Sequence, residues 1–133
     1  MLQPSLSIAL LRMLMGLVFM AHATIRLVDY SLPGFGEFLN SKGFPGGFYL
    51  AWIVTIFELL GGLLMVMRKF VKLFCAIEVL ILLTGIVIVH SSAGWFVVGK
   101  TLGGMEYSVV LIIVLTAIFL AEWKEERNIR PVL

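Results

Sequence analysis

Four long apolar stretches constrain the fold of this chain more than any other feature. They run roughly over residues 6–28, 49–67, 70–89 and 105–123. A helix needs about 20 mostly apolar residues to cross a bilayer, and each stretch meets that length. Two glycine-rich loops are predicted, one between the first and second stretches, which also contains Pro33 and Pro45, and one between the third and fourth. The pattern predicts an all-α integral membrane protein, a four-helix transmembrane bundle that forms a single domain over residues 1–133.

Composition supports lipid as the surrounding solvent. Of the 133 residues, 61% are hydrophobic and 14% are charged, whereas a soluble domain has about 45–50% apolar and about 25% charged residues. The net charge of +2 is too small for a nucleic-acid-binding surface. The single cysteine, Cys75, excludes an intrachain disulfide and is expected to pack as a small hydrophobe. We therefore expect contact with the lipid bilayer and no nucleic-acid partner.

Basic residues beside the stretches predict the orientation of the chain. With four spans, both termini and the short connection between the second and third spans share one face. That face holds Arg68, Lys69, Lys72, Lys124, Arg127 and Arg130, and the other holds Arg26, Lys42 and Lys100. Because positive charge accumulates on the cytoplasmic side, both termini are expected to be cytoplasmic. Ala21-His22-Ala23 is similar to a signal-cleavage site, but Arg12 interrupts the apolar stretch before it, so we expect the first helix to be retained.

A weak internal repeat relates the two halves of the chain. The segment from Gly16 to His22 is similar to that from Gly85 to His90, and Gly46–Tyr49 is similar to Gly103–Tyr107. The pattern indicates a parallel two-plus-two repeat about an axis along the membrane normal. Chance similarity between apolar segments is the alternative.

Three charged residues lie well inside the spans: Arg12, Glu58 and Glu78. Each would cost a few kcal/mol or more facing lipid, so they should point into the bundle beside small residues. At 100° per residue, one face of each of the first three helices combines such residues. These faces are Ser5, Arg12, Gly16, Ala23 and Arg26; Ala51, Thr55, Glu58, Gly62 and Met65; and Cys75, Glu78, Gly85 and Ser92. The fourth helix offers only Thr116 in its middle and is expected to support the others.

Helix depth predicts how these charges pair. Arg12 and Glu78 lie about 10 Å inside the same ends of their helices, at a rise of about 1.5 Å per residue, whereas Glu58 lies near the midplane. An Arg12–Glu78 ion pair is the first expectation, and a network that includes Glu58 is the alternative because arginine can extend toward it. One interpretation of the network is that it fixes the register of the helices. The other is that one carboxylate is incompletely paired and therefore accepts or donates a proton, and Glu58 is the candidate for that role.

A second polar group lies toward the opposite ends of the spans. Its members are His22, Arg26, His90, Glu106 and Tyr107. One interpretation is structural: the helix dipole favours Glu106 in a first helical turn, and Tyr107 anchors in the membrane interface. The alternative is that the five side chains converge on the polar head of a ligand and serve as proton-transfer groups. Two histidines can also ligate haem, but no other pattern supports this, and no metal site is expected.

Four groups of short motifs follow one another along the chain. They are Leu11-Arg12 with Gly16 and His22, then Phe57-Glu58 with Gly61-Gly62, then Gly94-Trp95-Phe96, and finally Gly103-Gly104-Met105-Glu106-Tyr107. Together they resemble the DoxX family of small four-helix bacterial membrane proteins. The chain departs from the family pattern where Ala23 replaces a glycine after His22, where Arg26 replaces a lysine, and where Ser108 replaces a proline.

The resemblance implies a multi-pass protein of the inner (plasma) membrane. The family is named for similarity to the small membrane subunit of an archaeal thiosulfate:quinone oxidoreductase. The resemblance implies that this chain is a small membrane subunit of an oxidoreductase system and binds a quinone or similar lipid-soluble molecule. The polar head of that molecule is expected among the second polar group, which is His22, Arg26, His90, Glu106 and Tyr107. Because the chain carries no flavin, haem or iron–sulfur motif, the redox cofactor is expected on a partner subunit, and a homo-oligomer is the other expected assembly. The chain is not evidently catalytic by itself.

Two other classes of function also fit the sequence. One is a scaffold or chaperone that holds a partner's membrane helix through the small-residue faces. The other is a proton-coupled carrier using Glu58, although four helices leave little room for an alternating path. Phenylalanines in the first connection are expected to anchor in the membrane interface or to cover the outer site; they are Phe35, Phe38, Phe44 and Phe48.

Overall fold

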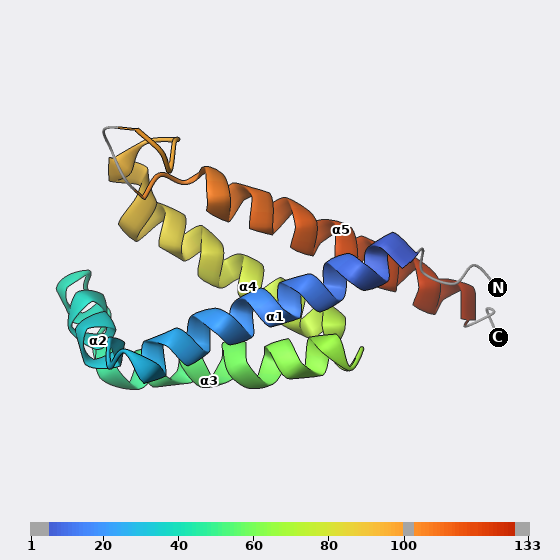
Figure 1. The fold of residues 1–133 in the computed structure, drawn as a ribbon, viewed down its shortest axis with the longest axis horizontal. Helices are drawn as coiled ribbons and strands as arrows, with labels where there is room; N and C mark the ends of the chain where they lie inside the picture. The colour runs from blue at the N-terminus through green and yellow to red at the C-terminus, as the bar shows by residue number, and fades with distance from the viewer. Residues whose placement is uncertain (1–5, 100–102, 130–133) are drawn as a thin grey trace. The chain divides into compact units, whose positions relative to one another are not determined.

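The computed structural model describes residues 6–99 and 103–129, and these residues contain helices and no strand. The elements are α1 (Leu6–Val28), α2 (Leu32–Ser41), α3 (Gly47–Val66), α4 (Val71–Gly85), η1 (Ile86–His90), η2 (Ser91–Ala93) and α5 (Glu106–Ile129), as Figure 1 shows. Four segments are long and apolar enough to cross a membrane: Leu6–Val28, Gly47–Val66, Val71–Ala93 and Glu106–Arg127. The predicted all-α fold with four spans is confirmed, and the chain is a multi-pass membrane protein.

The chain divides into two compact units. The α1–α3 unit comprises residues 13–70, and the α4–α5 unit comprises residues 71–133 together with residues 1–12. Each unit contains a pair of long helices. The single domain and the two-plus-two repeat stay predictions.

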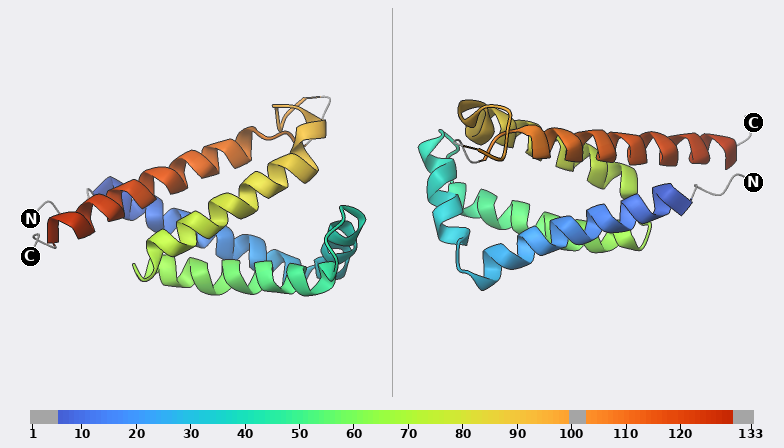
Figure 2. Two further views of the ribbon diagram at one scale, coloured as in Figure 1. Left: turned by 180° about the vertical axis from the view of Figure 1, so that it is seen from behind. Right: turned by 45° about the horizontal axis from the view of Figure 1, so that its top comes forward.

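A contact between two glycines sets the packing of the α1–α3 unit, in which α1 and α3 run antiparallel (Figures 1 and 2). A Cβ on Gly16 would lie 2.6 Å from the carbonyl oxygen of Gly62, and a Cβ on Gly62 would lie 2.6 Å from that of Gly16. Both positions require glycine because any side chain would collide with backbone, and small residues let helices approach closely in lipid. The predicted buried face of α3 is confirmed, since Ala51, Thr55, Glu58, Gly62 and Met65 are all buried.

The helix α2 lies where the sequence predicts a glycine-rich loop, so that prediction was wrong for residues 32–41. Pro33 stands in its first turn, where the fixed φ and the missing N–H of proline suit a helix start. A Cβ on Gly47 would lie 2.2 Å from the carbonyl oxygen of Gly36, and the Asn40 side chain accepts a 2.8 Å hydrogen bond from the Gly47 N–H. The helix α2 is therefore docked on the first turn of α3, across the end of the α1–α3 pair (Figure 1).

In the α4–α5 unit, α4 and α5 form an antiparallel helical pair (Figure 2). The α4 residues Phe74, Cys75 and Glu78 are buried. A buried stripe of α5 repeats at helical spacing and consists of Ser108, Leu111, Leu115, Ile118 and Glu122. Near one end, Lys72 forms an ion pair with Glu126, and its Nζ lies 5.4 Å from the centroid of the Trp123 ring. These contacts tie the two helices together outside their apolar middle.

One sequence-based expectation for this unit was wrong, the burial of Ser92. On α5, Thr116 is exposed and its hydroxyl donates to the Ile112 carbonyl at 2.7 Å, while the described polar side chains that are buried include Ser108 and Glu122. Ser92 is exposed although it was placed on the buried face of the third span. The five residues of η1 form a π-helical turn, whose wider i→i+5 bonding breaks the 100° periodicity beyond Gly85.

Candidate functional site

An ion pair between Arg26 of α1 and Glu58 of α3 is the polar centre of the α1–α3 unit. The Arg26 side chain is 19% exposed and the Glu58 side chain is 7% exposed. A charge within a membrane span is costly unless it is paired, and each residue supplies the counter-charge of the other. Arg26 also lies in the last turn of α1, where a cation interacts favourably with the helix dipole.

The aromatic ring of Phe35 covers this ion pair from α2. The Arg26 guanidinium carbon lies 5.4 Å from the centroid of the Phe35 ring, within the range of a cation–π interaction. Because α2 is docked on α3 through Gly36, Gly47 and Asn40, Phe35 is held in place by the packing of its helix. The three helices of the unit thus meet at Arg26.

A pocket of about 260 Å³ lies beside Arg26, where α1 ends and where α2 and α3 begin. It is lined by Arg26, Leu27, Tyr30, Leu32, Pro33, Phe48 and Trp52. Its walls are almost entirely apolar and partly aromatic, and Arg26 contributes to one of them. Pockets of this composition hold ligands with an apolar body and a few polar atoms that fix their orientation.

Sequence reasoning placed Arg26 and Glu58 in two different polar groups, and the structure brings them together. Arg12, Glu58 and Glu78 are all buried, as the charge pattern predicts. The Arg12–Glu78 ion pair stays a prediction. Glu58 instead has a partner that the depth argument did not consider, because an arginine side chain is long enough to offset a difference in depth between two helices.

The second polar group also includes His22, which lies on α1 one turn before Arg26. The His22 side chain is exposed, and its ring meets the edge of Phe19 with the centroids 6.4 Å apart and the planes at 86°. This T-shaped contact orients the imidazole on the surface of α1.

The other three predicted ligand-head residues lie in the α4–α5 unit. His90 Nδ1 donates a hydrogen bond to the Gly103 carbonyl. Glu106 is the first residue of α5, and its carboxylate accepts a 3.1 Å hydrogen bond from the Val97 N–H. Tyr107 is exposed. The convergence of all five residues on one ligand head stays a prediction.

The segment before α5 is closed by backbone contacts as well. Glu106 N–H donates to the Trp95 carbonyl at 2.9 Å, and Met105 N–H donates to the Gly94 carbonyl at 3.1 Å. A Cβ on Gly104 would lie 2.1 Å from the Phe96 carbonyl oxygen, so the close approach requires glycine there. Glu106 therefore has a structural role at the start of α5.

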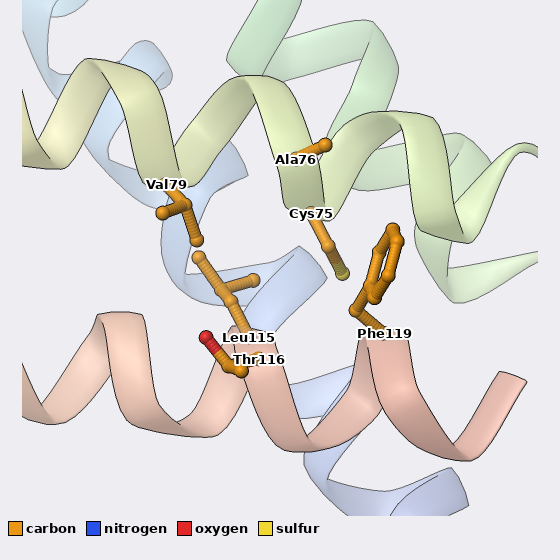
Figure 3. A pocket seen from close by; sticks show the side chains of 6 residues that line it. All are labelled: Cys75, Ala76, Val79, Leu115, Thr116 and Phe119. Atoms are coloured by element: carbon orange, nitrogen blue, oxygen red, sulfur yellow. The ribbon is translucent and has the colours of Figure 1, made fainter. Parts of the chain in front are cut away.

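A second pocket, of about 210 Å³, lies between α4 and α5 (Figure 3). Its lining residues are Cys75, Ala76, Val79, Leu115, Thr116 and Phe119, and Figure 3 shows the Cys75 thiol directed toward α5. The lining is apolar, since the Thr116 hydroxyl is bonded within its own helix. Cys75 and Thr116 are the lining residues that carry a thiol and a hydroxyl.

Sequence reasoning missed Glu122, which is 9% exposed near the end of α5. The charged residues that follow it, from Lys124 to Arg127, are typical of a solvated helix end. The spacing of Leu111, Leu115 and Ile118 would have placed it on the buried stripe. Among the described residues, no three His, Cys, Asp or Glu side chains are grouped to hold a metal ion.

Comparisons with known proteins complete the description. The family model described as DoxX matches residues 7–91, which cover α1 to α4 and η1. No curated protein and no solved structure matches the chain.

Proposed function

This chain belongs to the DoxX family, and from that premise we propose that it binds a quinone or similar lipid-soluble molecule as a small membrane subunit of an oxidoreductase system. The observation that carries the proposal is the α1–α3 pocket, an apolar and partly aromatic cavity with the ion-paired Arg26 among its lining residues. A flat apolar ring fits beside Phe48 and Trp52, and an oxygen on that ring would accept hydrogen bonds from Arg26.

The position of the pocket supports a ligand that arrives from the bilayer. Trp52 is a lining residue that is 39% exposed on α3, one of the four apolar spans. The docked helix α2 contributes Leu32 and Pro33 to the same pocket. A molecule dissolved in lipid meets the exposed side of Trp52 directly, whereas a strictly water-soluble molecule would first leave its hydration shell.

In this proposal each residue of the site has a separate task. Arg26 donates hydrogen bonds to the ligand head, and Glu58 holds the guanidinium in its orientation through the ion pair. Phe48 and Trp52 cover the faces of the ring. His22, His90, Glu106 and Tyr107 are proposed as proton-transfer or head-binding groups, and a partner subunit would carry the electrons.

We also propose that the protein lies in the inner membrane with both termini cytoplasmic. The proposal is supported by basic residues near the predicted cytoplasmic ends of the spans, namely Arg68, Lys69, Lys72, Lys124 and Arg127. Lys100 and Arg130, which also entered the count, lie outside the described residues.

Titration of the purified protein in lipid nanodiscs with a short-chain benzoquinone tests the binding proposal by calorimetry. We expect saturable binding that weakens at least about ten-fold in Trp52→Leu, because a wall of the pocket is removed. The matched control is Trp95→Leu, an exposed tryptophan of the α4–α5 unit, which should leave the affinity unchanged. Absence of saturable binding to the unaltered protein would refute the proposal.

A second candidate function is a scaffold for a partner's membrane helix. It is favoured by the apolar pocket between α4 and α5, where the small residues Cys75 and Ala76 leave room for a partner side chain. Stable co-purification with another membrane protein, weakened by Ala76→Phe, together with no quinone binding would favour this candidate. The carrier hypothesis has no comparable observation, since the charge of Glu58 is already balanced by Arg26.

A further inference from the structure

The turn between α3 and α4 consists of Met67, Arg68, Lys69 and Phe70, which belong to the α1–α3 unit. It joins two segments that are long and apolar enough to cross the membrane, so it lies at a membrane surface. All four residues are exposed, Met67 at 53% and Phe70 at 70%. The turn therefore presents two basic and two apolar side chains to the layer of lipid headgroups.

The end of α3 is closed by backbone hydrogen bonds within this turn. The Lys69 N–H donates to the Leu64 carbonyl at 2.7 Å, and the Arg68 N–H donates to the Met65 carbonyl at 3.1 Å. These are the two bonds of a Schellman motif, in which the residue with left-handed backbone is usually glycine. Here that residue is Arg68, with a φ of 59°.

Phe70 departs from the usual backbone in the same way, with a φ of 54°. Side chains are disfavoured in the left-handed region because the Cβ comes too close to the following carbonyl oxygen, and a bulky residue there is an outlier. The turn thus carries two large side chains where glycine would be less strained. Backbone strain of this kind is concentrated at functional sites, so the side chains of Arg68 and Phe70 are candidates for a role beyond closing the helix.

The two ends of the α1–α3 unit differ in charge. The acidic residues between positions 13 and 70 are Asp29, Glu37 and Glu58. Glu58 is buried in the ion pair with Arg26, and the other two follow the end of α1 or lie on α2, at the end of the unit where α3 begins. That end also carries Lys42, so its charges are mixed. The α3–α4 turn at the other end carries basic residues and no acidic one.

We propose that the α3–α4 turn binds the headgroup of an anionic phospholipid at the membrane surface. Arginine and lysine side chains donate hydrogen bonds to phosphate oxygens, and basic residues close to a membrane are attracted to anionic lipids. Phe70 places its ring among the upper parts of the acyl chains, as exposed aromatic residues do at a membrane interface. This site lies at the opposite end of α3 from the pocket and does not depend on the proposed function.

Native mass spectrometry of the full-length protein in an uncharged detergent, titrated with phosphatidylglycerol or phosphatidylcholine, measures this binding. We expect the unaltered protein to bind the first phosphatidylglycerol at least about five-fold more tightly than phosphatidylcholine. Lys69→Gln and Arg68→Gly should each weaken phosphatidylglycerol binding about five-fold and leave phosphatidylcholine binding unchanged. Glycine at position 68 retains the left-handed backbone of the motif, so the Arg68 variant removes the side chain without breaking the turn.

The matched control is Lys42→Gln, which removes the same charge from the other end of the same unit. Lys42 is exposed and lies against an aromatic ring, with its Nζ 5.5 Å from the centroid of Phe38. This variant should bind phosphatidylglycerol as the unaltered protein does. Phe70→Asn, which keeps a residue that tolerates left-handed backbone, should weaken the binding of both lipids by the same factor, because the lost ring carries no charge.

Two results would overturn the proposal. One is equal affinity of the unaltered protein for the two lipids. The other is an equal loss of phosphatidylglycerol affinity in Lys69→Gln and Lys42→Gln, because the attraction would then follow the net charge of the protein and not the turn. Circular dichroism establishes that each variant is folded.

Discussion

The ion pairs of the α1–α3 unit and the α4–α5 unit differ in how deeply they are buried. In the α1–α3 unit, Arg26 and Glu58 pair within the spans, with side chains 19% and 7% exposed. In the α4–α5 unit, Lys72 and Glu126 pair near the helix ends, with side chains 32% and 54% exposed. Both pockets have almost entirely apolar linings, and the one beside the first pair has Arg26 among its lining residues.

This difference shows which charged side chains of a membrane protein need a counter-charge from the protein itself. Water and lipid headgroups can solvate Lys72 and Glu126, so their pairing adds little to stability. Neither is available to Glu58, because it is buried within a span, so Arg26 must balance its charge. The Arg26–Glu58 pair is therefore expected to matter more to the stability of its unit than the Lys72–Glu126 pair.

The largest expected difference between the units comes from breaking each ion pair. Glu58→Gln should lower the free energy of unfolding by about 3 kcal/mol, because it leaves the Arg26 charge buried and uncompensated. Glu126→Gln should lower it by less than about 1 kcal/mol, since Lys72 is partly solvated. Unfolding of the purified protein in detergent micelles by increasing dodecyl sulfate measures both values. Equal losses would show that the two pairs do not differ as described.

The next largest effect concerns backbone approach. Gly62→Ala should lower the free energy of unfolding by about 2 kcal/mol, because the new Cβ would lie 2.6 Å from the Gly16 carbonyl oxygen. The matched change in the α4–α5 unit is Gly85→Ala, which has no atom within 4 Å of the new Cβ and should be neutral or stabilising by up to about 1 kcal/mol. The same micelle assay compares them, and similar losses for both variants would contradict the glycine contact.

A smaller effect is expected from the bond that joins α2 to α3. Asn40→Ala removes the acceptor of the Gly47 N–H and should cost about 1 kcal/mol, as loss of a helix cap does. Ser41→Ala is the control, because its hydroxyl bonds the Phe38 carbonyl of its own helix and is exposed. Amide hydrogen exchange in α2 should accelerate in Asn40→Ala alone. Unchanged exchange in both variants would mean that this bond does not hold α2 in place.

The smallest effect is expected at Thr116, the residue that the sequence first marked on the fourth span. Thr116→Val should change the free energy of unfolding by less than about 0.5 kcal/mol, because the side chain is exposed and bonds only its own helix among the contacts described. Thermal unfolding followed by circular dichroism measures the change. A loss above about 1 kcal/mol would show that the Thr116 side chain contributes to packing in the α4–α5 unit.

Much of the fold could be predicted because the bilayer imposes simple rules on sequence. The lengths of the apolar stretches predicted four spans, and the 100° periodicity predicted the buried face of α3 from Ala51 to Met65. The same periodicity failed beyond Gly85, because the π-helical turn changes the rotation per residue and no side chain announces it. Pro33 is a sequence signal for the start of α2, but the glycines around it favoured the prediction of a loop.

The sequence by itself determined that Arg12, Glu58 and Glu78 are buried, because a charge in a lipid-crossing segment must point away from lipid. Only the tertiary structure decided that Glu58 pairs with Arg26, since that depends on which helices are neighbours and how far a side chain reaches across them. The pocket was decided in the same way, since its walls come from the end of α1 and the starts of α2 and α3. Local pattern governs which face of a helix is buried, and packing between distant segments governs what that face meets.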